Sequence, residues 1–149
     1  MIEPGTPAPD FSLRNQDGEE VSLESLRGGT VVLVFYPLDF SPVCTDQLNV
    51  YEEVVDDFRA EGATLYGVSC DSTWAQTAFK ESLGVSIEQL SDWEPKGQAC
   101  RAFGVYHPGG FPQRALVIVG PDGVIKWSYQ ADSPGELPGA NLIFDGLAA

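Results

Sequence analysis

The stretch TVVLVFYPLDFSPVCT, residues 30–45, passes directly from a predicted strand into a predicted helix. Residues 30–36 are β-branched, aliphatic or aromatic without interruption, which predicts a strand that is buried on both faces. Ser41 is a favoured helix N-cap and Pro42 is favoured at the first helical position, so the helix is expected to begin there. Cys44 then falls in the first helical turn. Free backbone N–H groups and the positive end of the helix dipole favour a thiolate at that position.

These residues support two interpretations of Cys44. In open α/β sheets the active site forms in the loops at the carboxyl ends of the strands, and Cys44 follows such a strand. A reactive cysteine at a helix N-terminus is consistent with that position. A free cysteine is also among the most buried residue types and behaves as a small apolar side chain. The local sequence therefore leaves both a nucleophile and a buried core residue open.

The segment after Cys44 continues an alternation of strand and helix. Five apolar residues recur at helical spacing and predict one helix that Gly62 ends: Leu48, Tyr51, Val54, Val55 and Phe58. Residues 63–69 predict the next strand. Asp71 and Ser72 are capping residues for a further helix, which Gly84 ends.

The remaining elements complete an α/β pattern. We expect an N-terminal hairpin around residues 15–18, a short extended piece at 86–90, a helix at 97–103, a loop at 107–113, a hairpin turning at 120–123 and a last helix at 141–148. The first half predicts a parallel core, and the closing hairpin makes the sheet mixed. The sequence thus predicts one thioredoxin-like domain over residues 1–149, with a mixed central sheet flanked by helices and an N-terminal β-hairpin.

Composition excludes several classes of partner. The chain has 149 residues with 22 acidic and 8 basic side chains, which gives a net charge of −14. Nucleic acid and anionic membrane surfaces are therefore not expected as partners, because binding them rests on clustered Lys and Arg. The N-terminus has no signal-peptide pattern and no apolar run approaches a membrane span, so we expect a cytoplasmic protein. The acidic background also disfavours a thiolate, so local groups must stabilise one.

The cysteines do not fit a disulfide framework or a zinc site. Cys44, Cys70 and Cys100 are odd in number and widely spaced. Gln47 stands three residues after Cys44, so the Cys-x-x-Cys pair of a thioredoxin-type redox enzyme is absent. Structural zinc sites usually draw ligands from closely spaced pairs, and His107 with these three cysteines offers none. We expect His107 to be a loop residue rather than a base.

The pattern Pro37-x-x-x-Ser41-x-x-Cys44 resembles the active-site motif of the peroxiredoxins in its serine form. The resemblance covers nearly the whole chain, with further similar segments in the same order: GTPAPDFSLRNQDG, VVLVFYP, GVSCDS, LSDWEPKG, FGV and GPDG. The most similar branch is the AhpE-like one, near the bacterioferritin-comigratory type.

The resemblance implies a thiol-dependent peroxidase for hydrogen peroxide and organic hydroperoxides, without metal, haem or flavin. It implies that Cys44 is the peroxidatic cysteine, which attacks the peroxide and becomes a sulfenic acid. Ser41 and the N–H groups of Val43 and Cys44 then bind the peroxide, and Pro37 shields the thiolate. Arg114 stabilises the thiolate and the charge on the leaving oxygen.

Regeneration of the cysteine departs from the common pattern of the bacterioferritin-comigratory branch. The position five residues after Cys44, where that branch most often carries a resolving cysteine, is Asn49. Cys70 ends a strand beside the one leading to Cys44, so it is a candidate on the active-site side, and Cys100 is a second candidate. The simplest expectation is a one-cysteine mechanism. Its external reductant is thioredoxin, a glutaredoxin-like protein or a low-molecular-weight thiol.

Assembly and rival functions stay open at this point. The family's common dimer uses loops around the active site, so we expect a homodimer. Three aromatic residues belong either to the core or to that contact: Trp93, Phe103 and Tyr106. A thiol–disulfide oxidoreductase is one alternative function, against which the missing Cys-x-x-Cys argues. A non-catalytic binding module of the same fold is the other.

Overall fold

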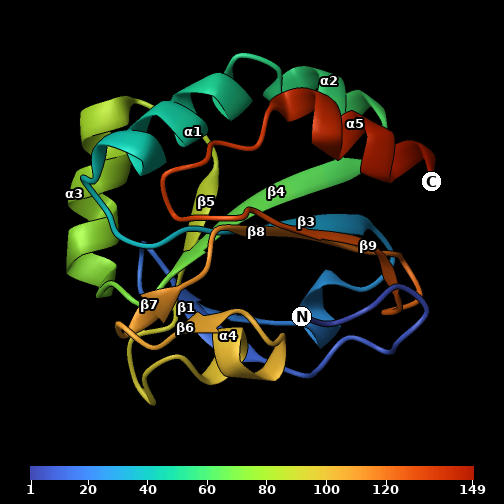
Figure 1. The fold of residues 1–149 in the computed structure, drawn as a ribbon, viewed down its shortest axis with the longest axis horizontal. Coiled ribbons are helices and arrows are strands. Elements are labelled where there is room, and N and C mark those ends of the chain that lie inside the picture. Colours follow the sequence, from blue (N-terminus) through green and yellow to red (C-terminus); the bar gives the residue numbers. More distant parts are fainter.

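A computed structural model describes all 149 residues and is built on one seven-stranded sheet (Figure 1). The strand order is β2-β1-β5-β4-β3-β8-β9. The strands are β1 (Ser12–Asn15), β2 (Glu20–Ser22), β3 (Thr30–Phe35), β4 (Ala63–Ser69), β5 (Glu88–Ser91), β8 (Ala115–Val119) and β9 (Ile125–Gln130). Strands β3, β4 and β5 are parallel, whereas β1, β2, β8 and β9 join through antiparallel pairs. The predicted mixed sheet with an N-terminal hairpin is confirmed.

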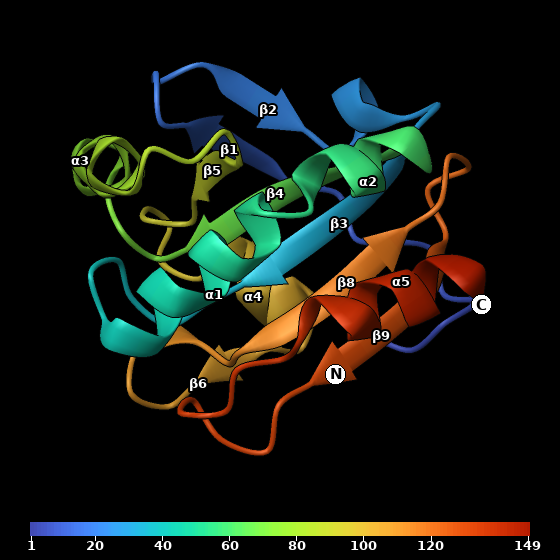
Figure 2. The same ribbon diagram turned by 90° about the horizontal axis from the view of Figure 1, so that it is seen from above.

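Helices cover the two faces of the sheet unequally. The helices are η1 (Glu24–Leu26), α1 (Pro42–Glu52), α2 (Val55–Ala60), α3 (Thr73–Leu83), α4 (Gln98–Ala102) and α5 (Ala140–Ala148). Helices α1, α2 and α5 lie over one face, and α4 lies on the other with the small hairpin of β6 (Tyr106–His107) and β7 (Phe111–Pro112) (Figures 1 and 2). The thioredoxin-like arrangement predicted from the sequence is therefore present.

Strand β3 separates two apolar cores, because its side chains alternate between the faces of the sheet. Val32 and Val34 pack with α1, α2 and α5 in one core. Val31 and Leu33 pack with η1 and α4 in the other. All residues of β3 after Thr30 are buried, as the uninterrupted apolar run predicted. The loop that carries the site residues therefore starts from a buried strand.

Two local predictions were wrong. The single helix expected up to Gly62 is two helices, because Val54 leaves the helical region with φ −120° and ψ 15°. Its N–H bonds to the carbonyl of Tyr51, only three residues back, which closes the end of α1. The chain then restarts as α2, which directs Phe58 into the core. The segment 107–113, expected to be a loop, contains the short β6–β7 pair.

No helix combines the length and the apolar character that crossing a membrane requires.

The contact of α5 with the sheet depends on Gly146. A Cβ atom there would lie 2.6 Å from the ring of Trp127 and 2.7 Å from Ile118. We expect Gly146→Ala to lower the free energy of unfolding by about 1–3 kcal/mol, because the core cannot accept the added methyl group without moving α5. Gly29→Ala is the control, since nothing lies within 4 Å of its Cβ position. Equal urea midpoints for the two variants would contradict this prediction.

Candidate active site

Cys44 lies where the chain leaves the carboxyl end of β3 and enters α1. Pro42 is the first residue of α1 and Ser41 is its N-cap. The first helical hydrogen bond runs from the Thr45 N–H to the Ser41 carbonyl, at 3.0 Å. The N–H groups of Val43 and Cys44 precede this bond and have no partner within the helix. Cys44 is the third residue of α1, as predicted, and its side chain is fully buried.

Arg114 is the positive charge beside this thiol. Its Nη2 donates to Cys44 Sγ at 3.2 Å, and its side chain is only 2% exposed. The register of the sheet explains the contact: Phe35, the last residue of β3, pairs antiparallel with Ala115, the first residue of β8. Arg114 immediately precedes β8, so it lies beside the start of the loop to Cys44. An apolar core position for Cys44 gives no reason to bury a guanidinium against it, which favours the nucleophile.

Two further acceptors hold the guanidinium in place, and a tyrosine supports one of them. Arg114 Nη1 donates to Gln47 Oε1 at 2.5 Å, and Nε donates to the Pro134 carbonyl at 2.8 Å. Gln47 Nε2 in turn donates to the Tyr51 hydroxyl at 3.1 Å, which donates to the Pro138 carbonyl at 2.6 Å. Burial raises the pKa of Tyr51 to about 12, so the hydroxyl keeps the proton that it donates. These hydrogen bonds orient the Arg114 guanidinium toward Cys44.

Sequence reasoning missed this supporting network. A signal was present, because Gln47 and Tyr51 follow Cys44 by three and seven residues and so lie on the same helical face. A glutamine on an otherwise apolar face is informative, since a buried amide must find partners. The role of Pro134 and Pro138 had no such signal, because their carbonyls are placed only by the irregular path of residues 131–138.

Ser41 and Pro37 lie beside the thiol-bearing turn. Pro37 is buried and Ser41 is partly buried. Ser41 is the N-cap residue as expected, but its hydroxyl makes no capping bond. It donates instead to the Leu38 carbonyl at 3.0 Å, within the loop that carries both residues. The expected capping role of the side chain is therefore wrong, and the hydroxyl oxygen keeps its acceptor capacity.

The two other cysteines do not join this site. Cys44 belongs to the core beneath α1, whereas Cys70 and Cys100 belong to the core on the opposite face of the sheet. Cys70, a candidate for the active-site side in the sequence, is instead a buried residue on the other face. Parallel strands bring their ends to one edge, but the residues at that edge still alternate between the two faces.

The remaining candidate residues separate by burial. Phe103 is fully buried and belongs to the core, whereas Trp93 is 57% exposed. Tyr106 is partly buried, with the Arg101 guanidinium 3.8 Å from its ring centre. His107 lies in β6 rather than in a loop, stacks on Phe111 and accepts the Gly109 N–H at its Nδ1. It makes no hydrogen bond to the residues around Cys44.

Asp39 is a half-buried carboxyl group of the same loop. Its Oδ1 lies 2.6 Å from the Tyr36 hydroxyl, which also lies 2.5 Å from Gln89 Oε1. Its Oδ2 is buried without a partner, and Asp71 accepts its N–H. Burial raises the pKa of Asp39 to about 7, with Asp71 adding to the rise and the Tyr36 hydrogen bond opposing it. A protonated carboxyl suits this geometry, because one hydroxyl hydrogen cannot serve two acceptors.

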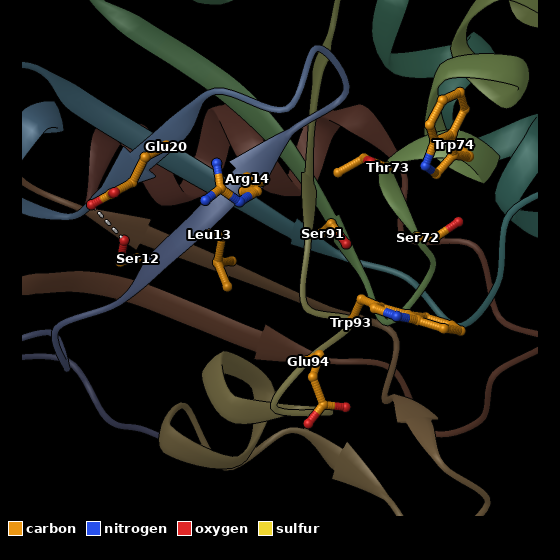
Figure 3. A pocket seen from close by; sticks show the side chains of 10 residues that line it. All are labelled: Ser12, Leu13, Arg14, Glu20, Ser72, Thr73, Trp74, Ser91, Trp93 and Glu94. Atoms are coloured by element: carbon orange, nitrogen blue, oxygen red, sulfur yellow. Dashed lines mark hydrogen bonds between the residues drawn. The ribbon is translucent and has the colours of Figure 1, made fainter.

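A groove lies beside the turn that joins β4 to α3. It has a volume of about 440 Å³, and its walls come from β1, β2, the start of α3 and the residues after β5 (Figure 3). Trp74 and Trp93 face it and are largely exposed, and Arg14 lies across from them (Figure 3). None of the residues around Cys44 lines this groove. The thiol chemistry and the groove are therefore distinct features of one edge of the sheet.

The arrangement around Cys44 suits nucleophilic chemistry at sulfur. A cation stabilises a thiolate and also any negative charge that develops on an atom leaving from beside it. Free N–H groups of a first helical turn bind the electron-rich end of a small substrate. Histidine and carboxylate groups are absent from the hydrogen-bonding partners of Cys44. The site is therefore built to stabilise negative charge rather than to pass protons along a relay.

Comparisons with known proteins identify relatives of this chain. Residues 4–128 match the family model described as AhpC/TSA family. The chain is 30% identical over 151 residues to alkyl hydroperoxide reductase E of Mycobacterium tuberculosis, a match that covers 100% of this chain and 98% of that protein. It is 33% identical over 130 residues to chloroplastic peroxiredoxin Q of Oryza sativa subsp. japonica, covering 86% of this chain and 59% of that one.

Solved structures show the same fold. The crystal structure of Enterococcus faecalis AhpC superposes with a TM-score of 0.90 at 30% identity, covering 99% of this chain and 92% of that chain. The crystal structure of peroxidoxin BcpB from Mycobacterium tuberculosis gives a TM-score of 0.83 at 25% identity, covering 99% and 96%.

The contact between Arg114 and Cys44 predicts the reactivity of the thiol. We expect Arg114→Met to slow the alkylation of Cys44 by iodoacetamide at neutral pH about 10- to 100-fold, because a hydrogen bond to a charged group contributes about 1.5–3 kcal/mol. The rate is measured by mass spectrometry of the tryptic peptide that contains Cys44. Arg101→Met is the matched control, since Arg101 contacts Tyr106 instead. Unchanged alkylation in the Arg114 variant would show that the guanidinium does not stabilise the thiolate.

Asp39 predicts a pH-dependent loss of stability. The folded protein holds a proton on Asp39 up to a pH of about 7, whereas the unfolded chain loses it near 3.8. Stability from this group is therefore full below the lower value and falls as pH rises toward the upper one. Relative to wild type, Asp39→Asn is expected to gain about 1–3 kcal/mol in free energy of unfolding between pH 4 and pH 8. Asp10→Asn, at an exposed carboxylate, is the control, and parallel pH curves for wild type and Asp39→Asn would refute the idea.

Proposed function

The chain belongs to the AhpC/TSA family of peroxiredoxins, which are thiol-dependent peroxidases, and from this we propose that Cys44 is its peroxidatic cysteine. One observation carries the proposal: a fully buried thiol lies 3.2 Å from a buried guanidinium, at the first turn of a helix. In a protein with a net charge of −14, Arg114 supplies the nearby positive charge that favours a thiolate.

The proposed reaction uses the groups around the thiol in sequence. The Cys44 thiolate attacks one oxygen of a hydroperoxide, the O–O bond breaks, and the sulfur becomes a sulfenic acid. The leaving oxygen takes up the proton that the thiol has lost, which gives water or an alcohol. Arg114 stabilises the charge that develops on this oxygen. Ser41 and the N–H groups of Val43 and Cys44 hold the peroxide in line, and Pro37 limits the access of solvent.

We propose a one-cysteine mechanism for regeneration. Cys70 and Cys100 lie in the opposite core, so neither sulfur faces Cys44 across the central sheet. Asn49 occupies the position of the common resolving cysteine of the bacterioferritin-comigratory branch. An external thiol then reduces the sulfenic acid, from thioredoxin, a glutaredoxin-like protein or a low-molecular-weight thiol.

The exposed apolar side chains support a homodimer formed at the active-site loop. Leu38 and Phe40 belong to this loop and are 47% and 56% exposed. Phe40 has a φ of 67°, a conformation that side chains other than glycine rarely adopt, and it holds its ring 5.1 Å from that of Phe79. We propose that a second copy of the chain covers this surface. Sedimentation of wild type and Phe40→Glu as the same monomer would exclude the dimer.

The peroxidase step is tested by trapping its intermediate. Reduced protein receives one equivalent of hydrogen peroxide and then a sulfenic-acid reagent, and the adduct is located by mass spectrometry. We expect a single adduct on Cys44, no adduct there in Cys44→Ser, and unchanged labelling in Cys70→Ala. A disulfide from Cys44 to another cysteine would replace the one-cysteine mechanism by a two-cysteine one. Absence of any modification at Cys44 would refute its role as the peroxidatic residue.

The hydroxyl of Ser41 gives a sharper test of peroxide binding. We expect Ser41→Ala to reduce kcat/KM for hydrogen peroxide by about 10-fold or more, because the substrate loses a positioned hydrogen-bond partner. The matched control is Ser82→Ala. Both hydroxyls donate to the carbonyl three residues before them, Ser41 at 3.0 Å and Ser82 at 2.8 Å, so the two variants lose the same local bond. Equal peroxidase activity in both variants would remove Ser41 from the substrate site.

A further inference from the structure

We propose that Cys70 and Cys100 form a second redox site, in which a hydroperoxide converts the two thiols into a disulfide and Asp92 accepts the proton of Cys100. The two sulfur atoms lie 3.7 Å apart in the core opposite Cys44, and Asp92 Oδ2 lies 3.0 Å from the Cys100 sulfur. The site goes beyond the peroxidase step at Cys44 and does not use that residue.

The register of the sheet brings Cys70 and Asp92 together. Ser69, at the end of β4, pairs in parallel register with Ser91 at the end of β5. Cys70 and Asp92 directly follow these residues, and the Asp92 N–H donates to the Ser69 carbonyl at 2.8 Å. The two strand ends therefore place a thiol and a carboxylate next to each other.

Asp92 then holds Cys100 against this pair. Its Oδ1 accepts the Ala99 N–H at 3.0 Å and its Oδ2 accepts the Cys100 N–H at 2.9 Å, so the carboxylate is fixed at the start of α4. Its side chain is 1% exposed. A nucleophile, a base within hydrogen-bonding distance and a group that orients the base form the usual constellation of an activated nucleophile. Here the nucleophile is Cys100, the base is Asp92 and the orienting groups are the two amides.

The protonation of the two thiols differs because their neighbours differ. The hydrogen bond from Cys100 lowers the pKa of Cys70, which is therefore the thiol that ionises first. The hydrogen bond with Cys70, burial and the Asp92 carboxylate raise the pKa of Cys100. Cys70 is also 5% exposed, whereas Cys100 is completely buried. Cys70 is thus the sulfur that meets the oxidant, and Cys100 needs a base before it reacts.

The two steps balance with a hydroperoxide as the only oxidant. The Cys70 sulfur attacks one peroxide oxygen and the O–O bond breaks, which leaves Cys70 as a sulfenic acid. The leaving oxygen takes the thiol proton to give an alcohol or water. Cys100 then attacks the Cys70 sulfur and passes its proton to Asp92. The hydroxide that leaves Cys70 takes up this proton as water. The sum consumes one hydroperoxide and two thiols and yields a disulfide.

A metal centre is the competing use of the same three side chains. Their ligating atoms lie within 4.8 Å of one another. Structural zinc, however, takes four ligands, and only three are offered here. The two sulfurs in mutual contact therefore favour disulfide chemistry over metal binding.

The site is tested in Cys44→Ser, which separates it from the peroxidase. This variant is incubated with excess hydrogen peroxide, and its tryptic peptides are mapped without reduction. We expect residues 60–80, with Cys70, to be linked to residues 97–101, with Cys100. The link is lost in Cys44→Ser/Cys70→Ala and in Cys44→Ser/Cys100→Ala. Free thiols, unlinked sulfinic acids or zinc retained by the purified protein would overturn the proposal while leaving the role of Cys44 intact.

Asp92→Asn tests the base separately. We expect this change in the Cys44→Ser background to slow disulfide formation about tenfold or more at neutral pH, while Cys70 still forms a sulfenic acid that a sulfenic-acid reagent traps. Equal slowing of sulfenic-acid and disulfide formation would indicate a structural defect alone, and that result would remove Asp92 from the mechanism. If the variant does not fold, the peptide map of Cys44→Ser still decides whether the disulfide forms.

Discussion

The contact between the Arg114 guanidinium and the Cys44 sulfur is the interaction around which this structure is arranged. The Arg114 guanidinium is only 2% exposed, so its N–H groups need hydrogen-bond partners within the protein. A buried charge without partners is strongly destabilising. Here the partners are a thiol, the Gln47 amide and a backbone carbonyl, rather than a carboxylate. A carboxylate would neutralise the cation and leave less of its field for sulfur. The chosen partners orient the guanidinium and leave its charge directed at Cys44.

This choice of partners matters more because the chain is acidic. Its net charge of −14 comes from 22 acidic and 8 basic residues, and the structure contains one ion pair, between Arg59 and Asp56 at the surface. Most acidic side chains therefore have no cationic partner. Exposed charges are screened by salt over about 10 Å, whereas buried groups are screened much less. A single cation held inside the protein can therefore stabilise negative charge beside it, despite the opposite sign of the whole molecule.

The central sheet divides the thiol chemistry into two compartments. On the face covered by α1, Cys44 has a cation as its neighbour; on the other face, Cys70 and Cys100 have each other and the carboxylate of Asp92. A cation favours the charged form of a thiol, whereas a carboxylate disfavours it. The cysteines on the two faces therefore have opposite electrostatic surroundings. We propose different tasks for them: Cys44 as the peroxidatic cysteine, and Cys70 with Cys100 as a pair that forms a disulfide.

The sequence by itself determined the strand at residues 30–36, the start of α1 at Pro42, the mixed sheet and the candidate Cys44, because these depend on local periodicity, capping and a motif that spans few residues. Arg114 became a candidate only through the resemblance of the chain to the peroxiredoxins, since no local pattern links it to Cys44. Tertiary structure alone decided that α1 and α2 are separate helices and that Cys70 faces away from Cys44. It also decided which backbone carbonyls of residues 131–138 reach Arg114 and Tyr51. The physical reason is that burial and pairing join residues far apart in the chain. Sequence periodicity indicates that a side chain is buried, but only the register of the strands and the path of the loops determine what it contacts.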